Sequence, residues 1–156
     1  MSNLYYEAER FRYLILAAQR QGVRMLNDQL KAHDLTASQA EVIRVLEDRQ
    51  PISLKELGSL LVCETGSPSR LIDRMVTDGL IDKMSDPNDS RYVLLRLTAK
   101  GTTLAGSVRH IEIGMYEQFR QLYTEEELIA TGDAMEKLIR HMPIEQALVK
   151  RGLISD

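Results

Sequence analysis

The segment from Ser53 to Thr98 constrains the fold of this 156-residue chain more than any other part of it. It begins with a short helical pattern at 53–61 and continues through a turn at 62–66. A second helical pattern then starts at Pro68, where the missing N–H of proline is no loss because the first turn of a helix leaves that donor unused. Gly79 ends this second helix in the left-handed position that glycine favours.

Two candidate strands follow the second helix. Residues 80–85 can form the first, residues 92–97 are rich in strand formers and pair back as the second, and residues 86–90 are turn formers. The order helix, turn, helix, hairpin predicts a helix-turn-helix followed by a β-wing. The expected fold class is therefore mainly α with a small β-wing.

Long helical patterns flank this unit on both sides. Apolar residues recur every three or four positions over about 2–31, 99–123 and 124–141, and a short last turn is expected over 144–150. Capping boxes mark three helix starts, and they pair Thr36 with Gln39, Ser53 with Glu56, and Thr124 with Glu127.

Helices of this length are hard to bury within one small domain, so they favour contact with a second copy of the chain. Packing within the chain would also explain them. We expect a single domain over 1–156, with a winged helix-turn-helix lobe at 35–100 and a helical dimerisation region formed by 1–32 together with 99–150.

The charge balance limits which partners fit. The net charge is −3, which weighs against nucleic acid, and segment 53–101 carries seven basic and seven acidic residues. If the chain binds DNA, its basic side chains must gather on one face, and the acids must point elsewhere or orient them. A single cysteine, no membrane-length apolar run and no secretory signal at the N-terminus predict a cytoplasmic protein.

The start of the second helix carries side chains that suit DNA, because a recognition helix reads base edges from its N-terminal end. Arg70 can bond guanine or a phosphate, and the short hydroxyls let the backbone approach closely. The candidates in this helix are Thr65, Ser67, Ser69, Arg70 and Arg74. An ordinary capped surface helix would show the same pattern, since helix-turn-helix shapes also occur without DNA.

The tip of the predicted hairpin carries Asp89 and Arg91. An arginine there can enter a narrow minor groove, whose negative potential attracts it. Asp89 can orient Arg91 or bridge back to an arginine of the helix. A plain exposed hairpin with a weak ion pair is the alternative.

Three segments together resemble the MarR family of bacterial transcription regulators. They are LTASQAEVIRVL at 35–46, SRLIDRMVTDGLIDK at 69–83 and DPNDSRYVLLRLTAKG at 86–101. The wing signature of the family is matched by Asp89, Arg91, Leu97 and Thr98.

This resemblance implies a dimeric winged helix whose first helix and last two helices interleave between subunits. By the same resemblance, the helix from Pro68 to Asp78 reads the major groove of double-stranded DNA and Arg91 reaches the minor groove. Arg74 matches an arginine that can pair with the wing aspartate, and Ser38 completes the candidate contacts. Two-fold symmetry implies a pseudo-palindromic operator.

The chain departs from the family pattern at the start of the recognition helix. Glu64 stands where a small hydroxyl is common, and Gly66 and Pro68 flank Ser67. These departures could alter base preference or indicate weak DNA binding.

Other chemistry finds little support. Family members that sense oxidants usually place a reactive cysteine near the N-terminus, and this chain has none there, so we expect Cys63 to be a buried structural thiol. His33, His110 and His141 are too scattered to predict a metal site, and no cofactor is expected. No catalytic motif is present in the sequence, so no enzyme is expected.

The sequence therefore predicts a cytoplasmic, homodimeric transcriptional repressor. The family resemblance implies release from DNA by an effector such as a small aromatic acid, with Tyr13, Glu41 and His110 as candidate pocket residues. Two alternatives stay open: a protein-interaction module on the same dimeric scaffold without DNA binding, and a redox sensor through Cys63.

Overall fold

The computed structural model describes residues 3–63 and 66–156. The chain divides into two compact units, Met1–Ala37 and Ser38–Asp156. The first unit holds the long helix α1 (Asn3–Leu30) and the 3-10 turn η1 (Lys31–His33). Asp34 then adopts a left-handed backbone with φ of 55°, and the side chain of Asn27 accepts the N–H of Ala37 at 2.8 Å.

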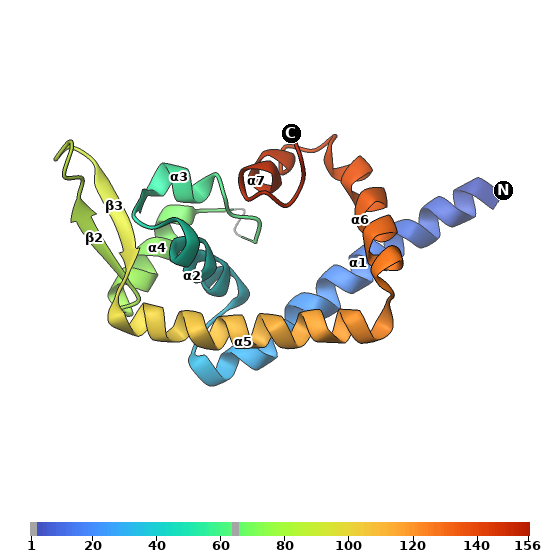
Figure 1. The fold of residues 1–156 in the computed structure, drawn as a ribbon, viewed down its shortest axis with the longest axis horizontal. Helices are drawn as coiled ribbons and strands as arrows, with labels where there is room; N and C mark the ends of the chain where they lie inside the picture. The colour runs from blue at the N-terminus through green and yellow to red at the C-terminus, as the bar shows by residue number, and fades with distance from the viewer. Residues whose placement is uncertain (1–2, 64–65) are drawn as a thin grey trace. The chain divides into compact units, whose positions relative to one another are not determined.

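The remaining elements follow the predicted order closely (Figure 1). They are α2 (Ala37–Arg49), β1 (Ile52–Ser53), α3 (Leu54–Gly58), α4 (Pro68–Thr77), β2 (Ile81–Ser85), β3 (Val93–Leu97), α5 (Ala99–Leu122), α6 (Glu125–Ile139) and α7 (Glu145–Lys150). The expected fold class, mainly helical with a small β-wing, is confirmed.

A three-stranded antiparallel sheet in the order β1-β3-β2 forms the wing and its base. Lys83 of β2 faces Leu95 of β3, and Leu95 also faces Ile52 of β1. The strand β1 was not predicted, because its two residues give no alternating pattern that sequence can reveal.

The core of the second unit lies where α2, α3, α4 and the sheet converge. Its largest fully buried side chains come from elements far apart in the sequence, as expected for one lobe with a shared core. They include Ile43, Leu46, Leu57, Ile72, Met75, Ile81, Leu95 and Val108. This core holds the recognition helix from its inner side.

Helix ends follow local chemistry. Thr124 and Glu127 form the full capping box that was predicted, and the Ser53 hydroxyl caps α3 by accepting the N–H of Glu56. Among the described residues, no helix is long and apolar enough to cross a membrane.

Close backbone contacts fix the junction between the wing and α5. Gly79 has φ of 73°, as predicted for a helix stop. The hydroxyl of Thr98 donates to the carbonyl of Gly79 at 2.6 Å and accepts the N–H of Gly101 at 3.0 Å. A Cβ atom on Gly101 would lie 2.2 Å from the carbonyl oxygen of Leu80, so only glycine fits at this crossing.

We expect Gly101→Ala to lower the free energy of unfolding by about 2–3 kcal/mol, because the added methyl group must displace the backbone at Leu80. Gly106→Ala is the matched control in the same helix, since a Cβ there meets nothing within 4 Å. That control should raise stability by about 0.5–1 kcal/mol through helix propensity. Urea denaturation at one protein concentration measures both, and equal effects would contradict the close crossing at Gly101.

Candidate nucleic-acid interface

The start of α4 is built by Ser67 and Pro68. Ser67 is the N-cap, and its Oγ accepts the N–H of Arg70 at 3.4 Å and lies 3.2 Å from the Oγ of Ser69. Pro68 occupies the first turn, as its fixed φ predicts. The inner side of the helix buries Ile72 and Met75, so its first turn is presented outward.

Arg70 and Arg74 lie one turn apart on the outer side of α4, and both are exposed. With Ser67 and Leu71 they line an open surface groove. Within residues 3–63 and 66–156, neither guanidinium has a hydrogen-bond or ion-pair partner. Two unpaired arginines beside a serine cap form a surface that suits an anion such as DNA phosphate or a guanine edge.

Asp89 pairs with Arg91 at the wing tip. Arg91 donates Nε to Asp89 Oδ1 at 2.9 Å and Nη2 to Oδ2 at 2.6 Å, and its backbone N–H also donates to Oδ1 at 3.1 Å. These bonds hold the pKa of Asp89 below its usual value and raise the pKa of Arg91. Two roles were predicted for Asp89: to orient Arg91, or to form an ion pair with an arginine of the helix. In the described residues Asp89 binds Arg91 and forms no ion pair with Arg74.

Two further acids of the lobe, Asp73 on α4 and Asp82 on β2, each have a basic partner. Asp73 pairs with Lys83 at 2.8 Å, and Asp82 lies 3.9 Å from Arg96. Both pairs are exposed, so each adds little stability. Their effect on the interface is to neutralise acids next to α4 while Arg70 and Arg74 keep their charge.

Ser38 and Thr65 are the other two candidate DNA contacts. Ser38 lies half-buried in the first turn of α2. Thr65 and the departure at Glu64 lie outside the described residues. The described candidate contacts thus form two groups, one at the start of α4 (Ser67, Ser69, Arg70 and Arg74) and one at the wing tip (Asp89 and Arg91).

Glu41 was a candidate residue of the effector pocket, and the structure gives its carboxylate three partners. The side chain is buried, and it accepts the N–H of Val62 at 2.8 Å and of Cys63 at 2.7 Å. It also forms an ion pair with Arg151 at 2.7 Å. Its role in the structure is to hold the turn before α4, and direct contact with an effector stays a prediction.

The prediction that Cys63 is a buried thiol is wrong, because its side chain is exposed. Leu60 and Leu61 are buried before it, so they fill the core where a cysteine was expected. The sulfur nevertheless lies against Glu41. Desolvation, followed by the charge of Glu41 and its hydrogen bond, raises the pKa of the thiol to about 11, and Arg151 opposes the rise.

The other two candidates for the effector pocket are exposed side chains. Tyr13 is exposed on α1 with the Arg12 guanidinium 4.8 Å from its ring centroid, and His110 is exposed on α5. Among the described residues, no three His, Cys, Asp or Glu side chains gather as metal ligands.

The Cys63 thiol should react slowly in the folded protein. Its pKa of about 11, against a usual 9.0, leaves about 100-fold less thiolate at pH 8. We expect iodoacetamide to alkylate the folded protein roughly 10- to 100-fold more slowly than the chain unfolded in urea. The lower end of this range allows for the greater intrinsic nucleophilicity of a high-pKa thiolate, which partly offsets the smaller thiolate fraction. Equal rates in the folded and unfolded chain would restore the redox-sensor alternative.

Comparison with known proteins places this geometry in a family. Residues 35–101 match a family model described as a winged helix DNA-binding domain. The chain is 32% identical over 103 residues to the multiple antibiotic resistance protein MarR of Escherichia coli strain K12. The aligned region covers 66% of this chain and 72% of the relative. It is 31% identical over 105 residues to the HTH-type transcriptional regulator MgrA of Staphylococcus aureus, with 67% and 71% covered.

Solved structures agree with the sequence relatives. A mutant MarR from E. coli complexed with operator DNA superimposes with a TM-score of 0.74 at 26% identity, covering 88% of this chain and 99% of that one. The MepR–DNA complex of S. aureus shares the fold, with a TM-score of 0.78 at 21% identity and coverage of 85% and 98%. The wing, the arginine-bearing helix and these relatives lead to one conclusion: the chain belongs to the MarR family of winged helix-turn-helix transcriptional regulators.

Proposed function

We propose that this chain is a homodimeric, sequence-specific DNA-binding repressor of transcription. In this proposal α4 enters the major groove and the wing tip enters the adjacent minor groove. The single observation that carries it is the pair of exposed guanidinium groups of Arg70 and Arg74 on the outer side of α4, which have no partner among residues 3–63 and 66–156. The family relationship and the resemblance to a MarR–operator complex support the same assignment.

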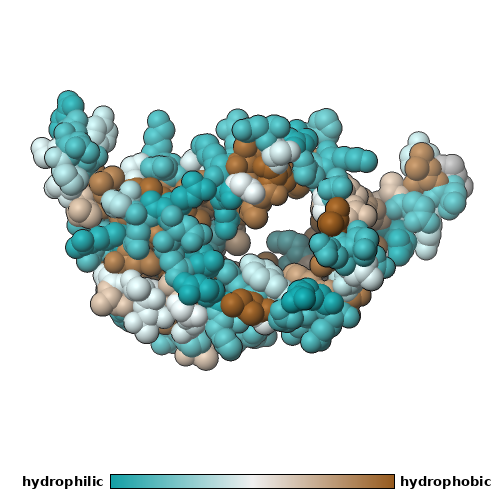
Figure 2. All heavy atoms as spheres, viewed as in Figure 1, coloured by the Kyte–Doolittle hydropathy of each residue, from teal (hydrophilic) through white to brown (hydrophobic). Residues whose placement is uncertain are grey.

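The acidic net charge of −3 is compatible with this proposal. Affinity for DNA depends on the cations that face the phosphates rather than on the total charge. Asp73 and Asp82 are each neutralised by a partner, and Asp89 orients Arg91. Figure 2 shows the wing tip as a hydrophilic projection, as a minor-groove contact requires.

The proposed dimer rests on apolar side chains that the described chain leaves uncovered. Figure 2 shows hydrophobic side chains reaching the surface along α5. α6 has no buried residue, although its pattern is amphipathic. The exposed members on α5 and α6 and the turn between them include Ile113, Tyr116, Phe119, Leu122, Tyr123, Leu128 and Ile129. Large exposed apolar patches mark interaction surfaces, and a second copy of the same chain supplies a matching one.

Release by an effector belongs to the same proposal. A small aromatic acid that favours another spacing of the two recognition helices would shift the population away from the DNA-bound form. Tyr13 and His110 are exposed and available to such a ligand, whereas the carboxylate of Glu41 already has three partners. The proposed location of the repressor is the cytoplasm.

Arg91→Ala should weaken binding to a DNA fragment selected by the wild-type protein from a random library. The loss should be about tenfold, as expected for one minor-groove arginine worth about 1–2 kcal/mol, and the dimer should stay intact. Lys137→Ala is the control, because it removes one exposed positive charge from α6.

Fluorescence anisotropy across a salt series measures both variants. Phosphate contacts predict a wild-type affinity that falls steeply with salt. Unchanged affinity in Arg91→Ala would remove the wing from the interface. A wild-type protein that binds no DNA at low salt would favour the protein-interaction alternative.

A further inference from the structure

The C-terminal end of the chain is joined to α2 by two arginines. Arg151 Nη1 donates to Glu41 Oε1 at 2.7 Å, and Arg49 Nη2 donates to the backbone carbonyl of Lys150 at 2.7 Å. Both contacts link residues more than 100 positions apart in the sequence. The last helix and its tail are therefore attached to the DNA-binding lobe by specific hydrogen bonds.

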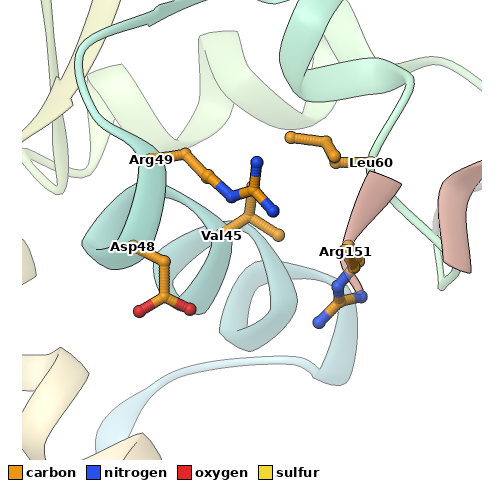
Figure 3. Close-up of a pocket in the computed structure, with 5 residues that line it drawn as sticks. All are labelled: Val45, Asp48, Arg49, Leu60 and Arg151. Carbon is orange, nitrogen blue, oxygen red and sulfur yellow. The ribbon is translucent and has the colours of Figure 1, made fainter. Parts of the chain in front are cut away.

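The space between α2 and this C-terminal segment is small. Figure 3 shows Arg49 and Arg151 approaching it from different elements, while the carboxylate of Asp48 points away. The cavity measures about 50 Å³ and is lined by Val45, Asp48, Arg49, Leu60 and Arg151. Such a volume holds a few waters at most and no organic ligand. This space therefore lies within a packing contact between α2 and the C-terminal segment and is not a binding pocket.

Glu41 carries the contact from the C-terminal segment to the turn before α4. Its two oxygens accept the N–H groups of Val62 and Cys63, and Cys63 precedes Pro68, the first residue of α4, by five positions. A buried carboxylate needs hydrogen-bond donors and a countercharge, because desolvation of an unpaired charge is expensive. Arg151 is the countercharge, so the position of Glu41 depends on it.

The C-terminal segment is also fixed at its other end. The guanidinium of Arg140, at the end of α6, donates to Glu136 of α6, to Glu145 of α7 at 3.1 Å and to the carbonyl of Ser155 at 2.9 Å. Polar contacts thus hold α7 and the tail at two places, to the end of α6 through Arg140 and to α2 through Arg151 and Arg49. The backbone of α7 connects the two places.

We propose that Glu41 and Arg151 are positioning residues that fix the turn before the recognition helix, so that the C-terminal segment 145–156 sets how α4 is presented to DNA. This inference rests on the proposed DNA-binding function. It assigns neither residue a contact with DNA. A movement of α6 or α7 would reach α4 through this pair.

Cys63 reports on the turn without any DNA. Arg151 lowers the pKa of the Cys63 thiol, whereas desolvation and Glu41 raise it. If the turn stays in place when Arg151 is removed, the thiol pKa rises further and alkylation slows. If the turn loosens, Cys63 loses its desolvation and its carboxylate neighbour, the thiol pKa falls and alkylation accelerates. The two cases therefore differ in sign.

The first experiment measures iodoacetamide alkylation of Arg151→Met at pH 8.5. The proposal predicts a rate at least about fivefold above the wild type, since loss of most of the upward pKa shift increases the thiolate fraction. A rate equal to or below that of the wild type overturns it. If Arg151→Met does not fold, Arg151→Lys replaces it. The proposal then predicts an alkylation rate between that of the folded wild type and that of the wild type unfolded in urea.

The second experiment measures affinity for the library-selected DNA fragment and for an unrelated duplex. Arg151→Met should bind the selected fragment about tenfold more weakly, because binding must then also order the turn that Glu41 no longer holds, with little change on the unrelated duplex. Arg151→Lys should recover part of the loss. Lys150→Met, which removes one positive charge from the neighbouring residue, should change affinity by less than about twofold, because a single exposed charge contributes little.

The two experiments separate failure of this inference from failure of the proposed function. A wild-type protein without DNA affinity would refute the proposed function, and the alkylation rates would still decide whether Arg151 holds the turn. Wild-type DNA binding that is unaffected by Arg151→Met would overturn the positioning role alone.

Discussion

The carboxylate of Glu41 is the group on which the arrangement of the DNA-binding lobe depends. It is buried in α2 and satisfies the N–H groups of Val62 and Cys63 in the turn that leads to α4. Without an acceptor there, two backbone donors of an irregular turn would lose their hydrogen bonds, at about 1–3 kcal/mol each where they are shielded from water. Cys63, held in this way, lies four positions before Ser67, the N-cap of α4.

Charge in this lobe is arranged by pairing rather than by excess. Lys83 forms an ion pair with Asp73, and Arg96 forms one with Asp82. Asp89 binds the guanidinium of Arg91 with both carboxylate oxygens. Arg70 and Arg74 keep free guanidinium groups within the described part of the chain. An acidic protein can therefore present a local basic surface, which the total charge conceals.

Local chemistry made much of the fold predictable from sequence. Pro68, Gly79, Thr98 and the Thr124–Glu127 capping box each end or begin a helix where the sequence places them. The wing pair was also predictable, because Asp89 and Arg91 are only two positions apart and lie in a run of turn formers. Such features need no knowledge of distant parts of the chain.

What sequence could not reveal depends on contacts between distant residues. β1 exists because Ile52 faces Leu95, and Glu41 meets Arg151 across 110 positions. The burial of Cys63 was predicted wrongly for the same reason, because Leu60 and Leu61 fill the core and the backbone N–H of Cys63 is bonded to a carboxylate from α2. Glu41 was noticed as a pocket residue, but the partners that define its role are non-local.

The central claim is that two copies of α4 and its wing read DNA with two-fold symmetry. A hydroxyl-radical footprint of the wild-type protein on its library-selected fragment tests this most directly. The account predicts two symmetric protected blocks about one helical turn apart, each with a further protected patch in the flanking minor groove where the wing lies. A single protected block without symmetry, or protection that leaves both flanking minor grooves open, would contradict it.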